Sequence, residues 1–418
     1  MHFFKKPRIF YGYWIVIAAF FCLFLHSGLG FYAFSLFVSP LQAEFGWSRG
    51  AIMVAFTVYL VAQGIASPFV GRIVDRYGAG KLIAIGAIIS GLSFVLLSQT
   101  RSLWYFYIIY AIYGIGHVTS GHVPASVIVS NWFNKRRGTA MGMMSTGIGA
   151  GGFAIAPFIG GYILPTFGWK GGYIASALLT WIVTIPLALF VLKSKPADMG
   201  LYPDGVDSVE AETLAKASYQ ASGGLTPKVA LATSAFWLMT ITLSISAFSQ
   251  LGIVQNQVPY LEDIGFPVVM AATALGTIGL GSLIGKFIFG WLCDHIPPKY
   301  ACAMGCGLML VGASIIMNVG PSSSHATIWI YAIVMGLGIG SWLPTSSLLT
   351  STNFGLGSYG AIWGLINGFH GIIAAMGPMT MGYIYDTTGS YDQAFIIALV
   401  LLAISIVTIL LVRRPKSL

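Results

Sequence analysis

Charged residues are scarce in this sequence, and so are cysteines. Only 8% of the 418 residues are Asp, Glu, Lys or Arg, while 56% are hydrophobic; a soluble domain has about 25% charged residues. The four cysteines, Cys22, Cys293, Cys302 and Cys306, fall in or beside apolar runs, so neither a disulfide framework nor a zinc site is indicated. No acidic residue lies within an apolar run, and no set of catalytic acid, base and nucleophile is visible. The composition predicts an integral membrane protein that is not an enzyme and holds no metal or cofactor.

The basic residues do not gather in one place. The formal net charge is +9, yet Lys and Arg are spread over short loops rather than one face, which argues against a nucleic-acid partner. With the N-terminus in the cytoplasm, seventeen of the 21 Lys and Arg residues fall in cytoplasmic tails and loops, and only Arg49, Arg101 and Lys170 fall outside. Positive residues favour the cytoplasmic side of membrane spans. We expect a multi-pass protein of the inner or plasma membrane with both termini in the cytoplasm.

What the sequence has in abundance is long apolar runs. Twelve runs reach about 20 residues, the length that crosses a hydrocarbon core of about 30 Å. They centre near Phe21, Tyr59, Ser90, Gly116, Ala150, Thr180, Ser246, Leu280, Leu310, Leu337, Gly371 and Ala403. Six precede and six follow a polar stretch from Lys193 to Lys228 that prolines and glycines interrupt, as in a loop. We expect an all-α membrane protein of twelve transmembrane helices, with a six-helix bundle at 1–192, a cytoplasmic linker loop at 193–230 and a second six-helix bundle at 231–418.

The two halves also repeat each other. Residues 71–76 (GRIVDR) match 290–295 (GWLCDH) at an offset of 219, and residues 157–162 (PFIGGY) match 378–383 (PMTMGY) at an offset of 221. Two six-helix repeats in parallel orientation are typical of carriers that bind their substrate near the midplane between the halves. The repeat favours a carrier over a lone structural bundle, and it predicts that the two bundles are pseudo-symmetric.

One cation, Lys286, lies inside an apolar run that extends from Phe266 to Cys293. A lysine at bilayer depth costs about 2.5–3.5 kcal/mol on insertion scales, so some interaction must offset this cost. Because the apolar runs contain no acid to neutralise it, we interpret Lys286 as an anion-binding cation in a water-filled path. The alternative is a lysine that snorkels to the membrane surface, since Lys286 precedes Asp294 by eight residues, or about 12 Å of helix.

Two glycine-containing motifs carry a family resemblance. The segment from Gly71 to Lys81 resembles the loop 2–3 signature of the major facilitator superfamily, although Gly80 stands where a basic residue is more usual. The glycine-rich run 147–161 is similar to the helix 5 motif of that superfamily, although helix packing alone also explains small residues there. The resemblance implies a major facilitator fold whose cytoplasmic helix ends are locked by the loop motif; a solvated turn is the alternative. The gating residues that it implies are Asp75, Arg76, Asp294 and Arg136.

Shorter motifs narrow the resemblance. They are 131–138 (NWFNKRRG), 167–170 (FGWK), 258–261 (VPYL), 354–355 (FG) and 359–360 (YG). Together they resemble the branch of monocarboxylate and oxalate carriers over nearly the whole chain. The branch implies a helix 8 cation, usually arginine, that binds the substrate carboxylate eight residues before the motif aspartate, and Lys286 and Asp294 keep this spacing. Lysine offers a point charge where arginine offers a planar fork, so we expect carboxylate binding with a looser geometry.

Two departures from that branch bear on substrate and coupling. Oxalate carriers have a second cation in helix 11, and here that position is Ile366, which favours a monocarboxylate. Animal monocarboxylate carriers place an aspartate one turn before the helix 8 arginine and a lysine in helix 1, whereas this chain has Ser282 and the segment 31–36 (FYAFSL). The usual proton-coupling partners of the branch are therefore missing.

Histidines are the remaining titratable groups of the apolar runs besides Lys286. Histidine changes charge near physiological pH, so each is a candidate for the coupling proton or for a second positive charge, with a hydrogen-bonded packing role as the alternative. The candidates for proton coupling are His26, His117 and His370. His122 lies ten residues before Trp132, where oxalate carriers have a cavity tyrosine, so the resemblance places it in the substrate site.

Aromatic and amide side chains complete the candidate site. Tyr32 and Trp363 match aromatic positions that enclose the substrate in the resembling carriers. Asn367 and Asn256 are polar groups in apolar surroundings that could bind substrate, although hydrogen bonds between helices explain them equally well. The substrate-binding candidates are Lys286, Tyr32, His122, Trp363, Asn367 and Asn256.

These observations predict a secondary active transporter that moves a lactate- or pyruvate-like monocarboxylate by alternating access. We favour proton symport, with anion exchange next. The alternative is a dicarboxylate/monocarboxylate exchanger of the oxalate:formate type, in which protonated His122 replaces the missing helix 11 cation. A membrane sensor would need a sizeable signalling domain, and the loops are too short for one. We expect the substrate anion, a co-transported proton and the lipid bilayer as partners, and a monomer because the sequence shows no clear dimer stripe.

Overall fold

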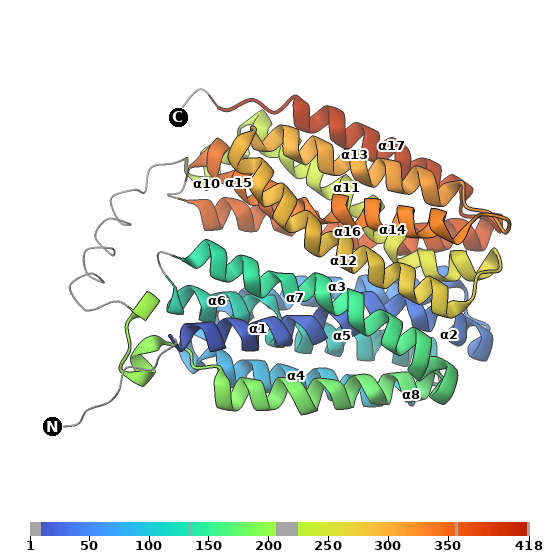
Figure 1. Cartoon of the computed structure of the whole chain (residues 1–418), viewed down its shortest axis with the longest axis horizontal. Helices are drawn as coiled ribbons and strands as arrows, with labels where there is room; N and C mark the ends of the chain where they lie inside the picture. The colour runs from blue at the N-terminus through green and yellow to red at the C-terminus, as the bar shows by residue number, and fades with distance from the viewer. Residues whose placement is uncertain (1–9, 134–135, 206–224, 356–357, 416–418) are drawn as a thin grey trace.

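The computed structural model of the chain describes residues 10–133, 136–205, 225–355 and 358–415, with the backbone alone at 68, 71–72, 75–77, 137–138 and 360. Figure 1 shows long helices side by side in two groups, one from the first half of the chain and one from the second. The described residues begin at Phe10, just before the first helix, and end at Pro415, just after the last. In Figure 1 the start of the first helix and the end of the last lie at the same end of the molecule, which we call the termini end. The other end, where Arg49 begins a helix, is called the Arg49 end.

The first half is built from long helical rods. We call a rod either a single long helix or a series of consecutive helical segments that run on in one direction. The rods are α1 (Gly12–Ser27) with η1 (Gly28–Tyr32), η2 (Ala33–Phe37) and α2 (Val38–Phe45); α3 (Arg49–Tyr77); α4 (Ala79–Leu97); α5 (Leu103–Ser120) with α6 (His122–Trp132); α7 (Arg137–Phe158) with η3 (Ile159–Ile163); and α8 (Leu164–Leu179) with η4 (Thr180–Thr184) and η5 (Leu187–Val191). The short turns η6 (Pro196–Met199) and η7 (Pro203–Gly205) follow.

The second half has the same plan. After the short α10 (Pro227–Leu231), its rods are α11 (Ser234–Asp263), α12 (Val268–His295), α13 (Pro298–Met317), α14 (His325–Gly340) with α15 (Trp342–Phe354), α16 (Tyr359–Thr388) and α17 (Asp392–Leu410). Helices α7 and α12, and helices α3 and α16, form the main contacts between the halves.

The rods match the twelve apolar runs. Nine helical stretches within the described residues are long and apolar enough to cross a membrane. One of them, Thr139–Val191, has 53 residues and contains two rods, with a kink at Gly168 inside α8. The rods α5–α6 and α16 complete the set. Helices suit these runs because a bilayer offers no water to unpaired backbone groups. The predicted all-α membrane fold with twelve helices is confirmed.

The rods begin and end at residues suited to helix termini. Side-chain oxygens of Ser48, Ser102 and Thr233 accept the backbone N–H three residues later at the starts of α3, α5 and α11, as N-cap residues do. Gly46 ends α2 and Gly389 ends α16 in the left-handed conformation, which glycine adopts without a steric penalty.

Two rods are interrupted at equivalent places. Helix α5 gives way to α6 at Gly121, and α14 gives way to α15 at Ser341, an offset of 220. In each case a proline follows at the third position, Pro124 and Pro344. Proline lacks the N–H that a continuous helix needs and disfavours helical backbone before it. The break therefore recurs at the interval that relates the two halves, and it places His122 at the start of α6.

Candidate substrate site

Lys286 lies at the interface between the two halves. It sits on α12, is half-buried, and its Nζ donates to the backbone oxygen of Ser145 on α7 at 3.3 Å. The one ion pair found among the described residues does not involve Lys286. Its ammonium group therefore faces the other half of the molecule rather than lipid, with a carbonyl oxygen as its hydrogen-bond acceptor.

Glycines bring α7 close to α12 and make this reach possible. A Cβ built on Gly149 of α7 would lie 2.6 Å from the backbone oxygen of Gly279, and one built on Gly160, in the segment η3 that continues α7, would lie 2.5 Å from the Cβ of Ala272. By contrast, a Cβ on Gly161 would meet only Val269, at 3.6 Å. Part of the glycine-rich run is thus explained by the packing of two helices across the interface.

Tyr32 lies beside the same part of α12. It belongs to the π-helical segment η1 and is buried. Its ring packs directly against Gly152, where an added Cβ would lie 2.7 Å from the Tyr32 ring carbon Cε2. Its side chain lies near that of Ser282, one helical turn before Lys286. The structure therefore brings Tyr32 and Lys286 into one region.

Three histidines of the first half converge on this region. The rings of His26 on α1 and His117 on α5 are stacked with centroids 3.1 Å apart, and the Tyr59 hydroxyl lies 3.2 Å from His117 Nδ1. His122, exposed at the start of α6, lies 3.2 Å from the Ser126 hydroxyl and is close enough to both His26 and Lys286 for electrostatic interaction. Their spacing in the chain does not predict that these side chains form one basic cluster.

A small cavity adjoins the paired histidines. Its volume is about 10 Å³, and its lining includes His26, Tyr113, Ser120 and Ser90. The Ser90 hydroxyl is buried, and no group among the described residues is its hydrogen-bond partner. Such a cavity has room for about one water molecule.

The candidates on α16 form a separate group. Trp363 stacks on Tyr359 with ring centroids 6.3 Å apart, and the ring of Trp342 lies 6.2 Å from Trp363 and 5.1 Å from His370. Asn367 donates to the backbone oxygen of Trp363 within the helix, at 2.8 Å. No hydrogen bond or ring contact found among the described residues joins this group to Lys286. The roles of Trp363, Asn367 and His370 stay predictions.

Asn256 is surrounded by partners of its own half. It is 1% exposed, its Nδ2 donates to the backbone oxygens of Gly252 and Pro378, and its Oδ1 accepts from the Tyr391 hydroxyl at 3.1 Å. These bonds match the alternative that the amide joins helices.

The predicted gating residues lie at the termini end. The side chains of Asp75 and Arg76 fall outside the described set. Asp294 is exposed in the last turn of α12. Arg136 donates to the Tyr13 hydroxyl at 2.9 Å, and its backbone N–H points at Asp204 Oδ1 at 3.4 Å. The gating roles of all four residues stay predictions.

Two residues of the motif at 131–138 hydrogen-bond to the segment that follows the last rod of the first half. Asn131 donates to the backbone oxygen of Ser194 at 3.0 Å, and the Trp132 indole N–H donates to that of Lys193 at 2.7 Å. The Ser194 hydroxyl in turn accepts the backbone N–H of Ala79. This motif therefore has a structural role in the described residues.

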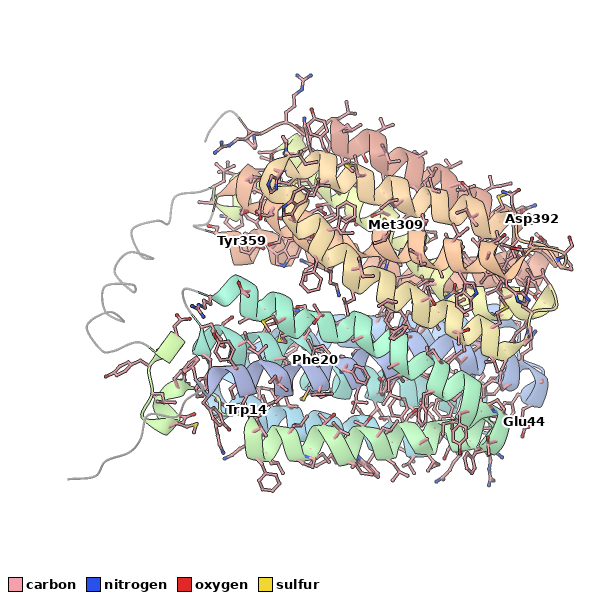
Figure 2. All side chains as sticks on the ribbon, viewed as in Figure 1. Trp14, Phe20, Glu44, Met309, Tyr359 and Asp392 are labelled. Carbon is pink, nitrogen blue, oxygen red and sulfur yellow. The ribbon has the colours of Figure 1, made fainter. Side chains whose placement is uncertain are left out.

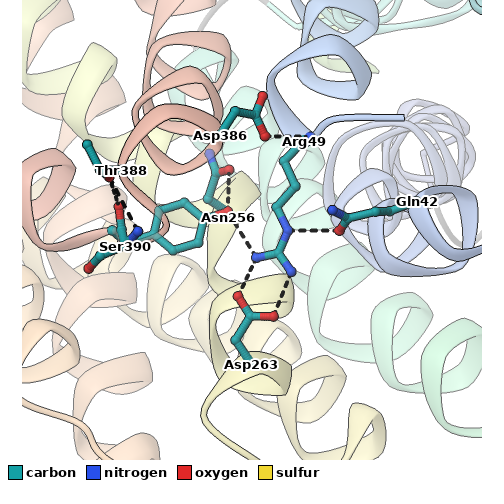
Figure 3. A network of polar contacts seen from close by, with 8 residues as sticks. Gln42, Arg49, Asn256, Asp263, Asp386, Thr388 and Ser390 are labelled. Carbon is teal, nitrogen blue, oxygen red and sulfur yellow. Dashed lines mark hydrogen bonds and ion pairs between the residues drawn. The ribbon is translucent and has the colours of Figure 1, made fainter. Parts of the chain in front are cut away.

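Sequence reasoning missed the polar network around Arg49 (Figure 3). The guanidinium group donates to both carboxylate oxygens of Asp263, each at 2.6 Å, and to Gln42 Oε1 at 3.0 Å. Asp386 accepts the backbone N–H groups of Arg49 and Gly50 at 3.0 and 2.7 Å. Arg49 belongs to the first half, whereas Asp263 and Asp386 belong to the second. The only signal in the sequence was that Arg49 is one of three outer-loop cations.

The contacts between α3 and α16 are unequal along their length. Toward the Arg49 end, a Cβ on Gly382 would lie 3.0 Å from Gly50, and the Thr57 hydroxyl donates to the backbone oxygen of Ala375 at 2.6 Å. Toward the termini end, a Cβ on Gly64, Gly364 or Gly368 would meet no atom within 4 Å. The halves are closed together at the Arg49 end. Figure 2 marks this end by Glu44 from the first half and Asp392 from the second, with Tyr359 at the other.

Comparison with known proteins gives consistent matches. The model of the Major Facilitator Superfamily matches residues 16–378. The chain is similar to monocarboxylate transporter 13 of Rattus norvegicus (25% identical over 391 residues, 93% of this chain and 86% of the relative). It is also similar to monocarboxylate transporter 11 of Homo sapiens (26% over 396 residues, 92% and 79%) and to the uncharacterized MFS-type transporter YcxA of Bacillus subtilis strain 168 (23% over 380 residues, 90% and 89%).

Two crystal structures share the fold. Both are of a bacterial homolog of the human lysosomal transporter Spinster. The inward-facing, unoccupied form has a TM-score of 0.75 at 17% identity and covers 97% of this chain and 98% of that chain. The inward-facing, occupied form has a TM-score of 0.74 at 16% identity and covers 97% of each chain.

Proposed function

Because the chain belongs to the Major Facilitator Superfamily, we propose that it carries a small organic monocarboxylate, such as lactate or pyruvate, across a membrane by alternating access. Membership confirms the predicted major facilitator fold, and it makes the chain a membrane transporter and not an enzyme. The similarity to monocarboxylate transporters 11 and 13 supports the substrate class.

The observation that carries the proposal is the position of Lys286. Its ammonium group points from α12 to α7, across the two halves that must move relative to each other, and its acceptor is the Ser145 carbonyl oxygen at 3.3 Å. A hydrogen bond involving a charged group is strongest when both partners are charged, so a substrate carboxylate would displace this carbonyl readily. Neutralising the lysine lowers the cost of excluding water from it, and this favours closure of the halves over bound substrate.

The single charge argues for one carboxylate. Ile366, at the position where the resembling oxalate carriers have a second cation, is 1% exposed and packs in the apolar core. A second carboxylate of the substrate would lack a fixed cation there. Tyr32, beside Ser282 on α12, would cover the bound anion from the Arg49 side.

Closure at the Arg49 end defines the state of the carrier. With the termini in the cytoplasm, as the distribution of Lys and Arg favours, closure at the Arg49 end would correspond to an inward-facing conformation. In this state Lys286 would exchange substrate with the cytoplasm. We propose the inner or plasma membrane as its location.

The histidine cluster is our candidate for proton coupling. His26 and His117 are stacked beside a cavity with room for about one water molecule,, and His122 lies close to both His26 and Lys286. A proton on this cluster adds positive charge near the anion site, so proton and anion would each favour binding of the other, as linkage requires. The carrier would then act as a proton symporter.

Uptake into proteoliposomes tests the proposal. The Lys286→Gln variant should lose uptake of labelled lactate or pyruvate by about ten- to a hundredfold, because a charged hydrogen bond is worth about 1.5–3 kcal/mol. Lys286→Arg should retain carboxylate binding. Lys170→Gln is the matched control, because the ammonium group of Lys170 lies 5.2 Å from the centroid of the Trp169 ring, away from the proposed site. Wild-type uptake by a folded Lys286→Gln protein would refute the assigned role of this lysine.

Exchange of a dicarboxylate for a monocarboxylate is the second candidate. The observation that favours it is the proximity of His122 to Lys286, since a His122 that takes up a proton together with the bound anion would supply a second cation. In this case oxalate or malonate should inhibit uptake of the monocarboxylate, and transport should require substrate inside the liposomes. A pH gradient that drives uptake into empty liposomes would favour symport instead.

A further inference from the structure

We infer that Arg49 is the latch that holds the two halves together at the Arg49 end and so sets how often the carrier opens on that side. This latch comprises Arg49, Gln42, Asp263 and Asp386. The inference rests on the alternating-access cycle proposed above, but it does not depend on the identity of the substrate or on Lys286.

The first component is a two-pronged ion pair. The guanidinium group binds both oxygens of Asp263 at 2.6 Å, a geometry in which arginine adds specificity as well as attraction,. Gln42 of the first half accepts from Nε and aims the group at α11. Arg49 also lies over the Tyr385 ring, 4.2 Å from its centroid. The two terminal nitrogens of the guanidinium group therefore bind the second half, while Nε binds the first.

The second component is a helix cap supplied by the other half. The first backbone N–H groups of a helix have no partner inside it, and the helix dipole favours an anion there. Ser48 caps α3 from its own half by accepting the N–H of Ala51, and Asp386 of α16 accepts those of Arg49 and Gly50. If the halves separate, these two donors lose their acceptor. The cap is therefore formed only when this end is closed.

Gly50 lets the cap form. A Cβ at this position would lie 2.6 Å from Asp386 Oδ2 and 3.0 Å from the backbone nitrogen of Tyr383. The facing residue on α16 is also a glycine, Gly382. The close packing of Gly50 against Gly382 and the polar contacts of Arg49, Asp263 and Asp386 therefore favour the same closed arrangement at this end.

The latch is suited to repeated opening because closure also carries a cost. Asp263 keeps 32% of its side chain exposed, against 6% for Arg49, so water can reach one partner of the ion pair. Deeper in the interface, Gln255 donates to the backbone oxygen of Phe31 at 3.0 Å, but its Oε1 is buried without a partner in the described part of the chain. A buried, unpaired acceptor is unfavourable, and opening would hydrate it.

The test measures the distance between the halves directly, without substrate. Spin labels at Ala43→Cys and Gln393→Cys, exposed neighbours of Glu44 and Asp392 in Figure 2, report the Arg49 end. Labels at Thr139→Cys and His295→Cys report the termini end. Cys293, the partly exposed native cysteine, is replaced by alanine; the other three are buried.

In Arg49→Gln and Asp263→Asn, the ratio of open to closed conformations at the Arg49 end should rise about ten- to a hundredfold, at about 1.4 kcal/mol per factor of ten. The distance at the termini end should shorten in the same samples. Gly50→Ala should open the Arg49 end without a change of charge, and the exchange Arg49→Asp with Asp263→Arg should restore closure. Arg101→Gln, which removes the same charge from an exposed residue of the same half, is the matched control.

Distance distributions of Arg49→Gln that equal those of Arg101→Gln would overturn the inference, and so would opening of Arg49→Gln that the exchanged pair does not reverse. A chromatographic check of folding accompanies each variant. Because no substrate is present, the distance measurement is independent of the Lys286 uptake experiment. Failure of the latch and failure of the proposed monocarboxylate transport can therefore be told apart.

Discussion

Replacing Gly160 with alanine should wedge the two halves apart at the Arg49 end. The added Cβ would lie 2.5 Å from the Cβ of Ala272 on α12. Ala272 is fully buried and its Cβ is fixed to the backbone, so no rotamer change can relieve the overlap. To restore an ordinary contact of 3.4 Å, η3 and α12 must separate locally by about 0.9 Å. The partly overlapping Leu36 side chain, at 3.1 Å, can adjust.

Overpacking of this kind costs about 1–3 kcal/mol. Since the contact joins the two halves and exists in the closed arrangement, the ratio of closed to open conformations should fall by about five- to 140-fold at 1.4 kcal/mol per factor of ten. Alanine also gains about 1 kcal/mol over glycine in helix propensity. The neighbouring variant Gly161→Ala has this gain but places its Cβ 3.6 Å from Val269, so the difference between the two variants isolates the wedge.

The assay is the distance between labels at Ala43→Cys and Gln393→Cys in purified protein. Gly160→Ala should populate the longer distance, and Gly161→Ala should match the parent protein. Uptake should slow in Gly160→Ala because closing the Arg49 end becomes unfavourable. Identical distance distributions for the two alanine variants would show that the backbone contact does not control the closed state, and the packing argument would fail.

Two further substitutions probe stability within single halves. Tyr331→Phe should lower the stability of the folded protein by about 1–3 kcal/mol, because the Tyr331 hydroxyl donates to Gln257 Oε1 at 2.6 Å and Gln257 is fully buried; an unchanged thermal unfolding curve would contradict this. Gly168→Ala should cost about 1–3 kcal/mol, since Gly168 has φ 66° and ψ −177°, a conformation open essentially to glycine alone. Gly142→Ala, where a Cβ would meet nothing within 4 Å, should leave the unfolding temperature unchanged or raised.

The rods and the central cation were predictable because their signals are local. An apolar run of about 20 residues has few alternatives to a membrane helix, and a lysine inside such a run, Lys286, is conspicuous without any knowledge of its surroundings. The repeat at offsets near 220 was visible in short motifs, and the structure adds the breaks at Gly121 and Ser341 to it.

The latch was not predictable because its parts are distant in the chain. Arg49 lies 214 residues from Asp263 and 337 from Asp386, and each stands at the end of an apolar run, where charged residues are ordinary. Asn256 shows the converse difficulty: an amide in an apolar run indicates a polar partner, but only the fold shows that the partners are Tyr391 and a backbone oxygen of α16. Hydropathy also gives no sign of the π-helical segment η1 that carries Tyr32.

The carbonyl partner of Lys286 has an electrical consequence. A carbonyl leaves the positive charge of the lysine uncompensated in the empty carrier, whereas a bound carboxylate cancels it. Each elementary charge that crosses a membrane potential of 100 mV gains or loses about 2.3 kcal/mol. The return of the empty carrier should therefore respond to voltage, whereas in the loaded step the lysine and its anion cancel and only a co-transported proton carries charge.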